Sequence, residues 1–207
     1  MATTKAPLFG LDASGTLANA IVFSKWKGRT YVRRHAVPSN PRSGLQVGIR
    51  AVMKFVTQNY AALSAGDKAE WAAAAAADNI TTLNAHVRDA ITRMRIGDGI
   101  RQDKTTALTA PIDPPTALVS TPLPKGLRLS WTEEAANKGD YVQYLYLYLS
   151  AGPALSIANL RLCIPYATKT VDVFGLTTGV AHFWKVRSGS AAGELGTASA
   201  EDSDTPT

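Results

Sequence analysis

The sequence predicts an α+β protein of two domains: an N-terminal β-hairpin with a three-helix unit, then a C-terminal all-β antiparallel sandwich. Strand-like residues flank a glycine turn at Gly28, apolar residues recur at helical spacing in three later segments, and short alternating segments fill the rest of the chain. The expected organisation is a flexible arm over 1–20, a basic hairpin plus helical docking domain over 21–97, a linker over 98–115 and a sandwich over 116–207.

The two parts differ in charge. Residues 1–110 contain 15 Lys and Arg against 7 acids, a net charge of +8, whereas residues 111–207 contain 7 against 9, a net charge of −2; together they give the +6 of the whole chain. No acid occurs between Asp12 and Asp67. This separation predicts that the N-terminal part faces a negatively charged partner.

The first element expected is the hairpin. The first twenty residues are rich in Gly, Ala, Ser and Thr and are interpreted as a loose arm, after which IVFSKW and RTYVRRHAV read as strands around the turn Lys27-Gly28. Its basic and aromatic residues, together with two arginines that follow it, are the candidate partner-docking residues: Lys25, Trp26, Lys27, Arg29, Tyr31, Arg33, Arg34, Arg42 and Arg50.

Three helices are expected next. Ser43 is a candidate N-cap for a helix of about five turns, whose predicted apolar stripe contains Leu45, Ile49, Val52, Met53, Val56, Tyr60 and Leu63. Ser64 and Asp67 form a cap signal for a second, alanine-rich helix that Asp78-Asn79 interrupts. The third helix is predicted from Thr82 to Ile96 and is ended by Gly97.

Residues 98–115 read as a polar, proline-ending linker. The remaining segments, among them GLRLSWT, YVQYLYLYLS and AHFWKVRSG, alternate as strands of a sandwich do. In YVQYLYLYLS one face of the strand is predicted to carry Val142, Tyr144, Tyr146 and Tyr148, and the other face Leu145, Leu147 and Leu149. Trp131 and Trp184 are predicted to lie in the core.

The C-terminal part resembles a fibronectin type III domain over residues 112–206. The resemblance rests on DPPTAL, on LRLSWT with Trp131, and on DVFGLTTGVAHFWKVRSGSAAGE. His182 stands where the family usually has its corner tyrosine, and Thr178 where it has a turn proline. The resemblance implies adhesion, display or spacing, and no chemistry.

Residues 14–97 are similar to a group of short proteins of unknown function that are common in phages and prophages. The similarity rests on SGTLANAIVFSKWKGRTYVRR, PSNPRSGLQVGIRAVMKF, ALSAGDKAEWAAAA and LNAHVRDAITRMR, in that order. It implies a structural component of a virion or prophage, often followed by an immunoglobulin-like module, and it provides no catalytic residues.

The residues with reactive side chains are scattered. His35, His86 and His182 have no second ligand at metal-binding spacing, and Cys163 has an apolar neighbourhood that predicts a buried thiol. No nucleotide-binding or nucleophile motif occurs, so neither catalysis nor a cofactor is expected. No signal peptide or membrane span is recognised, which predicts a soluble protein made in the host cytoplasm.

These observations together favour a non-enzymatic virion protein, either a capsid decoration or a head–tail accessory protein. Its expected partners are acidic surfaces of capsid, portal or tail subunits, contacted by several copies in a symmetric assembly and without a membrane. A nucleic-acid-binding protein is the alternative, with the basic hairpin, Arg42 and Arg50 on phosphates and Trp26 or Tyr31 stacked on bases. A host-surface adhesin is a third possibility.

Overall fold

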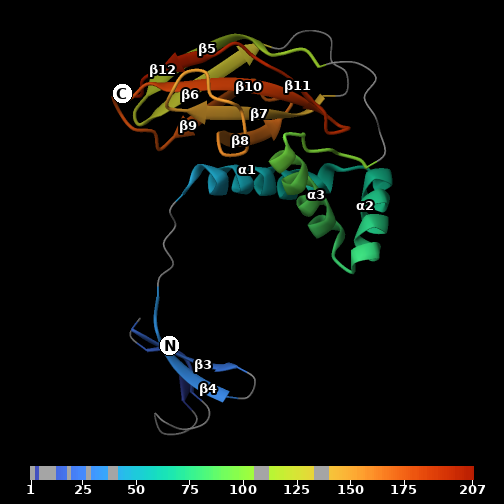
Figure 1. The fold of residues 1–207 in the computed structure, drawn as a ribbon, viewed down its shortest axis with the longest axis vertical. Coiled ribbons are helices and arrows are strands. Elements are labelled where there is room, and N and C mark those ends of the chain that lie inside the picture. The colour runs from blue at the N-terminus through green and yellow to red at the C-terminus, as the bar shows by residue number, and fades with distance from the viewer. Residues whose placement is uncertain are drawn as a thin grey trace. The chain divides into compact units, whose positions relative to one another are not determined.

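The computed structural model describes residues 3–4, 13–17, 20–26, 29–36, 42–104, 112–132 and 140–207. It divides into two compact units, Met1–Pro41 and Arg42–Thr207 (Figure 1). The α+β class is confirmed. The division differs from the predicted one, because the helices share a unit with the sandwich and not with the hairpin.

The first unit is an antiparallel sheet in the order β1-β2-β3-β4. Its strands are β1 (Thr3–Thr4), β2 (Ala13–Leu17), β3 (Ile21–Trp26) and β4 (Arg29–Arg34). The predicted hairpin is confirmed as the β3–β4 pair, in which Phe23 lies opposite Val32. Within the arm predicted over 1–20, residues 13–17 form β2, which pairs with β3. A two-stranded hairpin alone is marginally stable, and this additional strand stabilises it.

The second unit begins with the three predicted helices. They are α1 (Gly44–Asn59), followed by a 3₁₀ turn over Tyr60–Ala62, then α2 (Ala65–Asp78) and α3 (Thr82–Ile96). Ser64 and Asp67 form the predicted capping box, and Gly97 ends α3 in the left-handed conformation with φ of 92°. Ser43 occupies the N-cap of α1 but makes no side-chain cap bond.

The buried face of α1 is rotated from the predicted stripe. Val52 and Val56 are buried as predicted, but Leu45 and Met53 are 45% and 43% exposed, and Gly48, Ala51 and Phe55 complete the buried face. The small residues Gly48 and Ala51 belong to this face because the helix lies close against a neighbouring backbone, where large side chains do not fit.

The sandwich consists of two antiparallel sheets. One has the order β5-β6-β9, from β5 (Thr116–Leu123), β6 (Gly126–Thr132) and β9 (Thr170–Phe174). The other has the order β11-β10-β7-β8, with β12 also paired to β10; its strands are β7 (Asp140–Tyr148), β8 (Leu160–Pro165), β10 (His182–Ser190), β11 (Leu195–Ala198) and β12 (Asp202–Asp204). Trp131 and Trp184 are 4% and 0% exposed in the core between the sheets, which confirms their predicted place.

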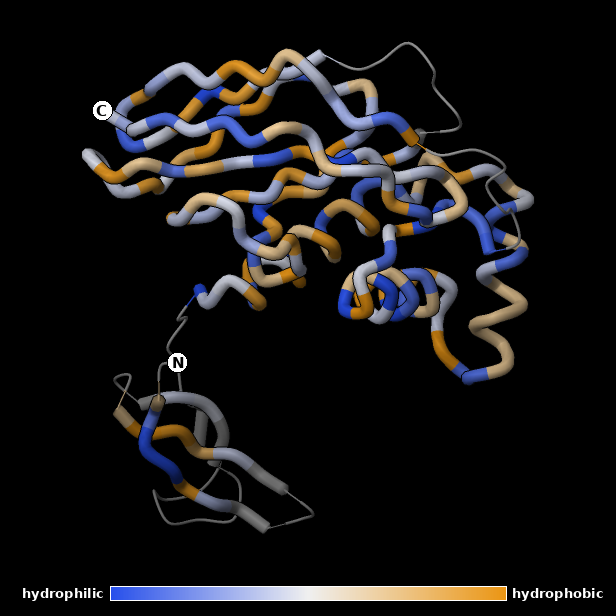
Figure 2. The backbone as a smooth tube through the Cα atoms, turned by 45° about the horizontal axis from the view of Figure 1, so that its top comes forward, coloured by the Kyte–Doolittle hydropathy of each residue, from blue (hydrophilic) through white to orange (hydrophobic). Residues whose placement is uncertain are grey.

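The helices form a third layer on the outer face of the larger sheet (Figure 1). The predicted two-faced pattern of β7 explains this layer. Leu145 packs into the core between the sheets, whereas Tyr144, Tyr146 and Tyr148 pack with Val52 and other apolar residues of the helices. Figure 2 shows hydrophobic stretches along the strands and the helices of this unit.

Close backbone contact joins α1 to the loop before β8. A Cβ atom added to Gly44 would lie 2.2 Å from the carbonyl oxygen of Ala158, and one added to Gly48 would lie 2.0 Å from that of Ile157. Glycine is therefore required at both positions for this approach. The helical layer and the sheet unit are therefore in direct backbone contact at these two positions.

The start of the predicted linker is also packed. Ile100 is fully buried and its N–H donates to the Tyr144 hydroxyl at 2.6 Å, while Gly99 N–H donates to the Gly193 carbonyl at 2.9 Å. Trp71 Nε1 donates to the Gln102 carbonyl at 2.8 Å from the other side. Residues 98–104 are thus part of the joint between helices and sandwich, and the prediction of a spacer is wrong there.

Candidate docking surfaces

Strand β4 lies at one edge of the first unit's sheet. Tyr31 and Val32 on this strand are 41% and 57% exposed, and Arg33 and Arg34 are also exposed. Successive side chains of a strand point to opposite faces, so the two arginines project to different sides of the sheet. An edge strand offers unpaired N–H and C=O groups, which makes β4 a site where another strand can add.

The other predicted residues of the hairpin are placed only by their backbone. Lys25 and Trp26 are in β3 and Arg29 is in β4, where Trp26 pairs with Arg29. Lys27 lies outside the described residues.

Arg42 and Arg50 belong to the second unit. Arg42 precedes α1 and Arg50 lies within it, so the structure separates them from the six hairpin-strand candidates Lys25, Trp26, Arg29, Tyr31, Arg33 and Arg34. Both line a cavity of about 300 Å³ between α1 and β8, together with Lys54 and Arg161. Sequence reasoning did not assign these last two to a site. Lys54 lies one helical turn after Arg50, and this spacing could have indicated that it belongs to the same site. Arg161 is distant in sequence, so no such spacing could have indicated it.

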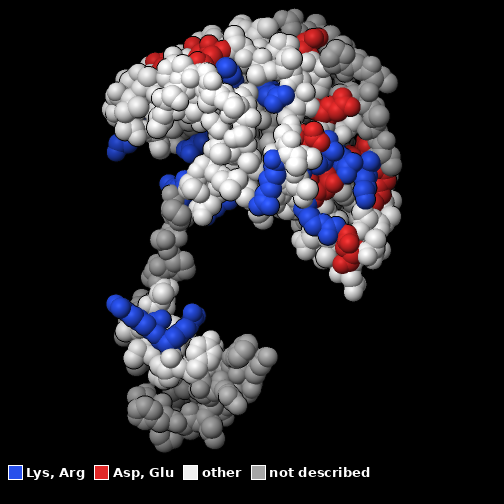
Figure 3. All heavy atoms as spheres, viewed as in Figure 1, with Lys and Arg blue, Asp and Glu red and all other residues white. Residues whose placement is uncertain are grey.

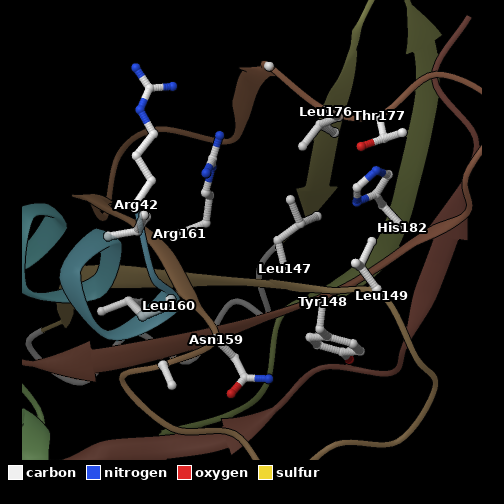
Figure 4. A pocket seen from close by; sticks show the side chains of 14 residues that line it. Arg42, Leu147, Tyr148, Leu149, Asn159, Leu160, Arg161, Leu176, Thr177 and His182 are labelled. Atoms are coloured by element: carbon white, nitrogen blue, oxygen red, sulfur yellow. The ribbon is translucent and has the colours of Figure 1, made fainter. Parts of the chain in front are cut away.

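A second cavity of about 250 Å³ adjoins the first and shares Arg42, Val47 and Arg161 with it. Figure 4 shows Arg42 and Arg161 on one side of this cavity and His182 with Leu176 and Thr177 on the opposite side. No Asp or Glu is among the described residues that line either cavity. In the view of Figure 3, basic side chains lie around α1, acidic ones gather on the sandwich margin, and both kinds are mixed near α2 and α3.

His182 takes the corner position of the sandwich. It is the first residue of β10, is 6% exposed and hydrogen-bonds with the backbone of Thr177. Burial lowers the pKa of His182, the backbone bond acts in the opposite direction, and the charge of Arg161 lowers the pKa further. The imidazole is therefore neutral near pH 7, and the positive charge of the cavities comes from the arginines and Lys54.

A second buried histidine lies away from these cavities. His86 stacks on Trp71 with ring centroids 4.6 Å apart, and its Nε2 lies 2.9 Å from the Arg101 carbonyl. Arg101 in turn donates to both oxygens of Asp89, at 2.6 and 2.9 Å. These contacts hold residues 101–102 against the helices, and we interpret the cluster as structural.

Within the ranges that the structure describes, no three His, Cys, Asp or Glu side chains are grouped as metal ligands. Burial raises the pKa of Cys163, which disfavours its thiolate. The described helices include none that is both long and apolar enough to cross a membrane.

No protein-family model matches the sequence, and no curated protein matches it. Among solved structures, the FN1–FN3 domains of chicken CNTN1 are similar at 15% identity over 47% of this chain and 33% of that chain, with a TM-score of 0.40. A structure described as a myokine is similar at 16% identity over 47% of this chain and all of its own, with a TM-score of 0.38. A β-1,2-glucanase from Parabacteroides distasonis is similar at 13% identity over 48% of this chain and 13% of its own, with a TM-score of 0.41.

The matched region thus spans about a third of the chicken chain, and identities this low describe fold alone. The sandwich is fibronectin type III-like in its strand order. A three-stranded sheet faces a larger sheet, and the helices cover β7 and β8 of the larger sheet. The comparisons assign no activity to the chain.

Proposed function

We propose that this protein is a non-enzymatic structural protein of a bacteriophage virion that docks through its N-terminal unit and displays the β-sandwich. The virion setting rests on the resemblance of residues 14–97 to phage and prophage proteins, a resemblance of sequence motifs that no family model matches. The observation that carries the docking is the edge strand β4, which exposes Tyr31, Val32, Arg33 and Arg34 in a unit of its own.

The chemistry of β4 selects its partner. Backbone groups at a strand edge provide affinity for any added strand, and the side chains decide which strand is accepted. Pairing of β4 with a second copy of itself would bring like charges together from Arg33 and Arg34, which destabilises cross-strand pairs. An acidic strand on a capsid, portal or tail subunit is therefore the preferred partner.

The test is whether the chain is incorporated into particles. Quantitative mass spectrometry of purified virions should find it at a fixed copy number that matches the symmetry of one structural component. The double variant Arg33→Glu with Arg34→Glu should be expressed and folded but missing from particles, whereas Arg95→Glu, on the exposed surface of α3, should be incorporated normally. Expression of the wild-type chain in infected cells without its appearance in virions would contradict the proposal.

Nucleic-acid binding is the second candidate, favoured by the basic residues of β4. Because Arg33 and Arg34 project to opposite faces of the strand, they do not form one phosphate-binding row. A plot of log K against log salt concentration for duplex DNA distinguishes the two functions, since phosphate binding requires a steep negative slope.

A further inference from the structure

The two adjoining cavities beside α1 form a groove in the second unit, here named the α1–β8 groove. Arg42, Arg50, Lys54 and Arg161 line it, and the shared residues Arg42, Val47 and Arg161 make it continuous. Arg161 is held in place because its Nη2 donates to the Phe174 carbonyl at 3.0 Å. Arg50 and Lys54 are one turn apart on α1 and so lie on the same face.

The start of α1 adds to the positive potential of the groove. The backbone bond from Val47 N–H to the Ser43 carbonyl, 3.0 Å long, belongs to the first turn. The N–H groups before Val47 have no acceptor within the helix. The first turn of α1 contains no acidic residue, and Ser43 makes no side-chain cap bond. Gly44 at this end lines the groove. A negative group placed there would be stabilised by the helix dipole as well as by the arginines.

The groove also has apolar walls. Leu147, Leu160 and Leu176 line one cavity, Ala51 and Leu162 line the other, and Leu149 at the rim is 65% exposed. A ligand that matches these walls must carry apolar groups next to its negative charges. A nucleic-acid strand instead needs flat aromatic platforms for its bases. The aromatic rings among the described lining residues are buried: Tyr148 is 7% exposed and its hydroxyl donates to Glu201 at 2.7 Å, and His182 is 6% exposed.

We propose that the α1–β8 groove binds an acidic peptide segment of a partner protein, with carboxylates on Arg42, Arg50, Lys54 and Arg161 and apolar side chains in the two cavities. This surface lies in the second unit and is independent of docking through β4. The protein therefore has a second interaction surface, through which the helix-covered side of the sandwich binds the partner protein.

The test uses the full chain and a fluorescent peptide of alternating Glu and Leu, with the same peptide carrying Gln for Glu and a single-stranded oligonucleotide of equal charge as comparison probes. The groove variant is Arg50→Gln with Lys54→Gln. A matched control, Arg95→Gln with Lys104→Gln, removes two exposed positive charges outside the groove lining. A third variant, Arg33→Gln with Arg34→Gln, reports on the N-terminal unit. Thermal unfolding shows that each variant is folded.

The acidic peptide should bind the wild-type chain more tightly than either comparison probe. The groove variant should weaken its binding about tenfold, the effect of two partly exposed charge contacts, and the matched control by less than about twofold. Three results would overturn the proposal: no binding of the acidic peptide, tighter binding of the oligonucleotide, or a loss of peptide binding in the β4 variant with none in the groove variant. The β4 variant is measured separately, so a result that excludes peptide binding in the groove differs from one that excludes docking through β4.

Discussion

Replacement of Gly48 by alanine tests whether the helical layer and the sandwich form one structure. An added Cβ would lie 2.0 Å from the Ile157 carbonyl oxygen and 3.0 Å from both the carbonyl carbon and the Cγ1 of that residue. Real Cβ atoms do not approach a backbone oxygen so closely, so α1 or the loop before β8 must move. In an isolated helix the same change would be favourable by about 1 kcal/mol, because alanine has the higher helix propensity.

The magnitude follows from these opposing effects. Overpacking of a core contact typically costs about 1–3 kcal/mol, and a rigid backbone neighbour places Gly48→Ala near the upper end. After the gain in helix propensity, the free energy of unfolding should fall by about 2 kcal/mol, which lowers Tm by about 4–8 °C for a chain of this size.

Gly66→Ala is the matched control. Gly66 lies in α2, and an added Cβ would have its nearest neighbour, the Ser64 Oγ atom, at 3.6 Å. This variant should gain about 1 kcal/mol and raise Tm by about 2–4 °C. Thermal and urea unfolding followed by circular dichroism measure both changes. A rise in Tm for Gly48→Ala similar to that of Gly66→Ala would refute the inference that α1 packs on the sandwich.

Three further predictions follow from the same packing. A fragment of residues 112–207 should bind a hydrophobic dye and self-associate, because it exposes the tyrosine face of β7, whereas residues 42–207 should be monomeric by size-exclusion chromatography. Asp89→Asn should destabilise the chain by about 1–3 kcal/mol in urea unfolding, because it deprives Arg101 of its carboxylate, while Asp78→Asn in an exposed pair should change little. Burial lowers the pKa of His86 from 6.5, so the unfolded state binds more protons as the pH falls below 6.5. The stability contributed by neutral His86 should be complete above that pH and fall as the pH drops towards the folded pKa, and His86→Gln should flatten this part of the urea-midpoint profile.

Local signals predicted the elements well. The boundaries of α3, the capping box at Ser64 and the β3–β4 hairpin depend on residues close in sequence, and each is as predicted. The strand β2 was missed because its residues, Ala13–Leu17, are mostly small and it pairs through its backbone. Propensity detects side-chain preferences, and it contains little information about a strand that is fixed by its neighbour.

The candidate site was predicted less completely, since its residues come together through tertiary packing. Arg42 and Arg50 were recognised from the absence of nearby acids, but they were grouped with the hairpin because they follow it in sequence. Arg161 is on β8 and reaches them only because α1 packs beside that strand. No local pattern around Arg161 marks it as part of a cationic site.

One sequence feature did contain the missing information. A sandwich strand normally has one face in the core and one in solvent, which gives alternating apolar and polar residues. Apart from Gln143, the segment YVQYLYLY is apolar or aromatic on both faces, so a layer must cover the tyrosine side. The helices, with an apolar face that includes Gly48 and Ala51, are the part of the chain able to provide it. That layer excludes water from Tyr144 and Tyr146, and it also positions α1 along β8 and thereby creates the α1–β8 groove. The same contact that stabilises the fold therefore brings four positive charges together, and the α1–β8 groove depends on the third layer and is absent from the sandwich alone.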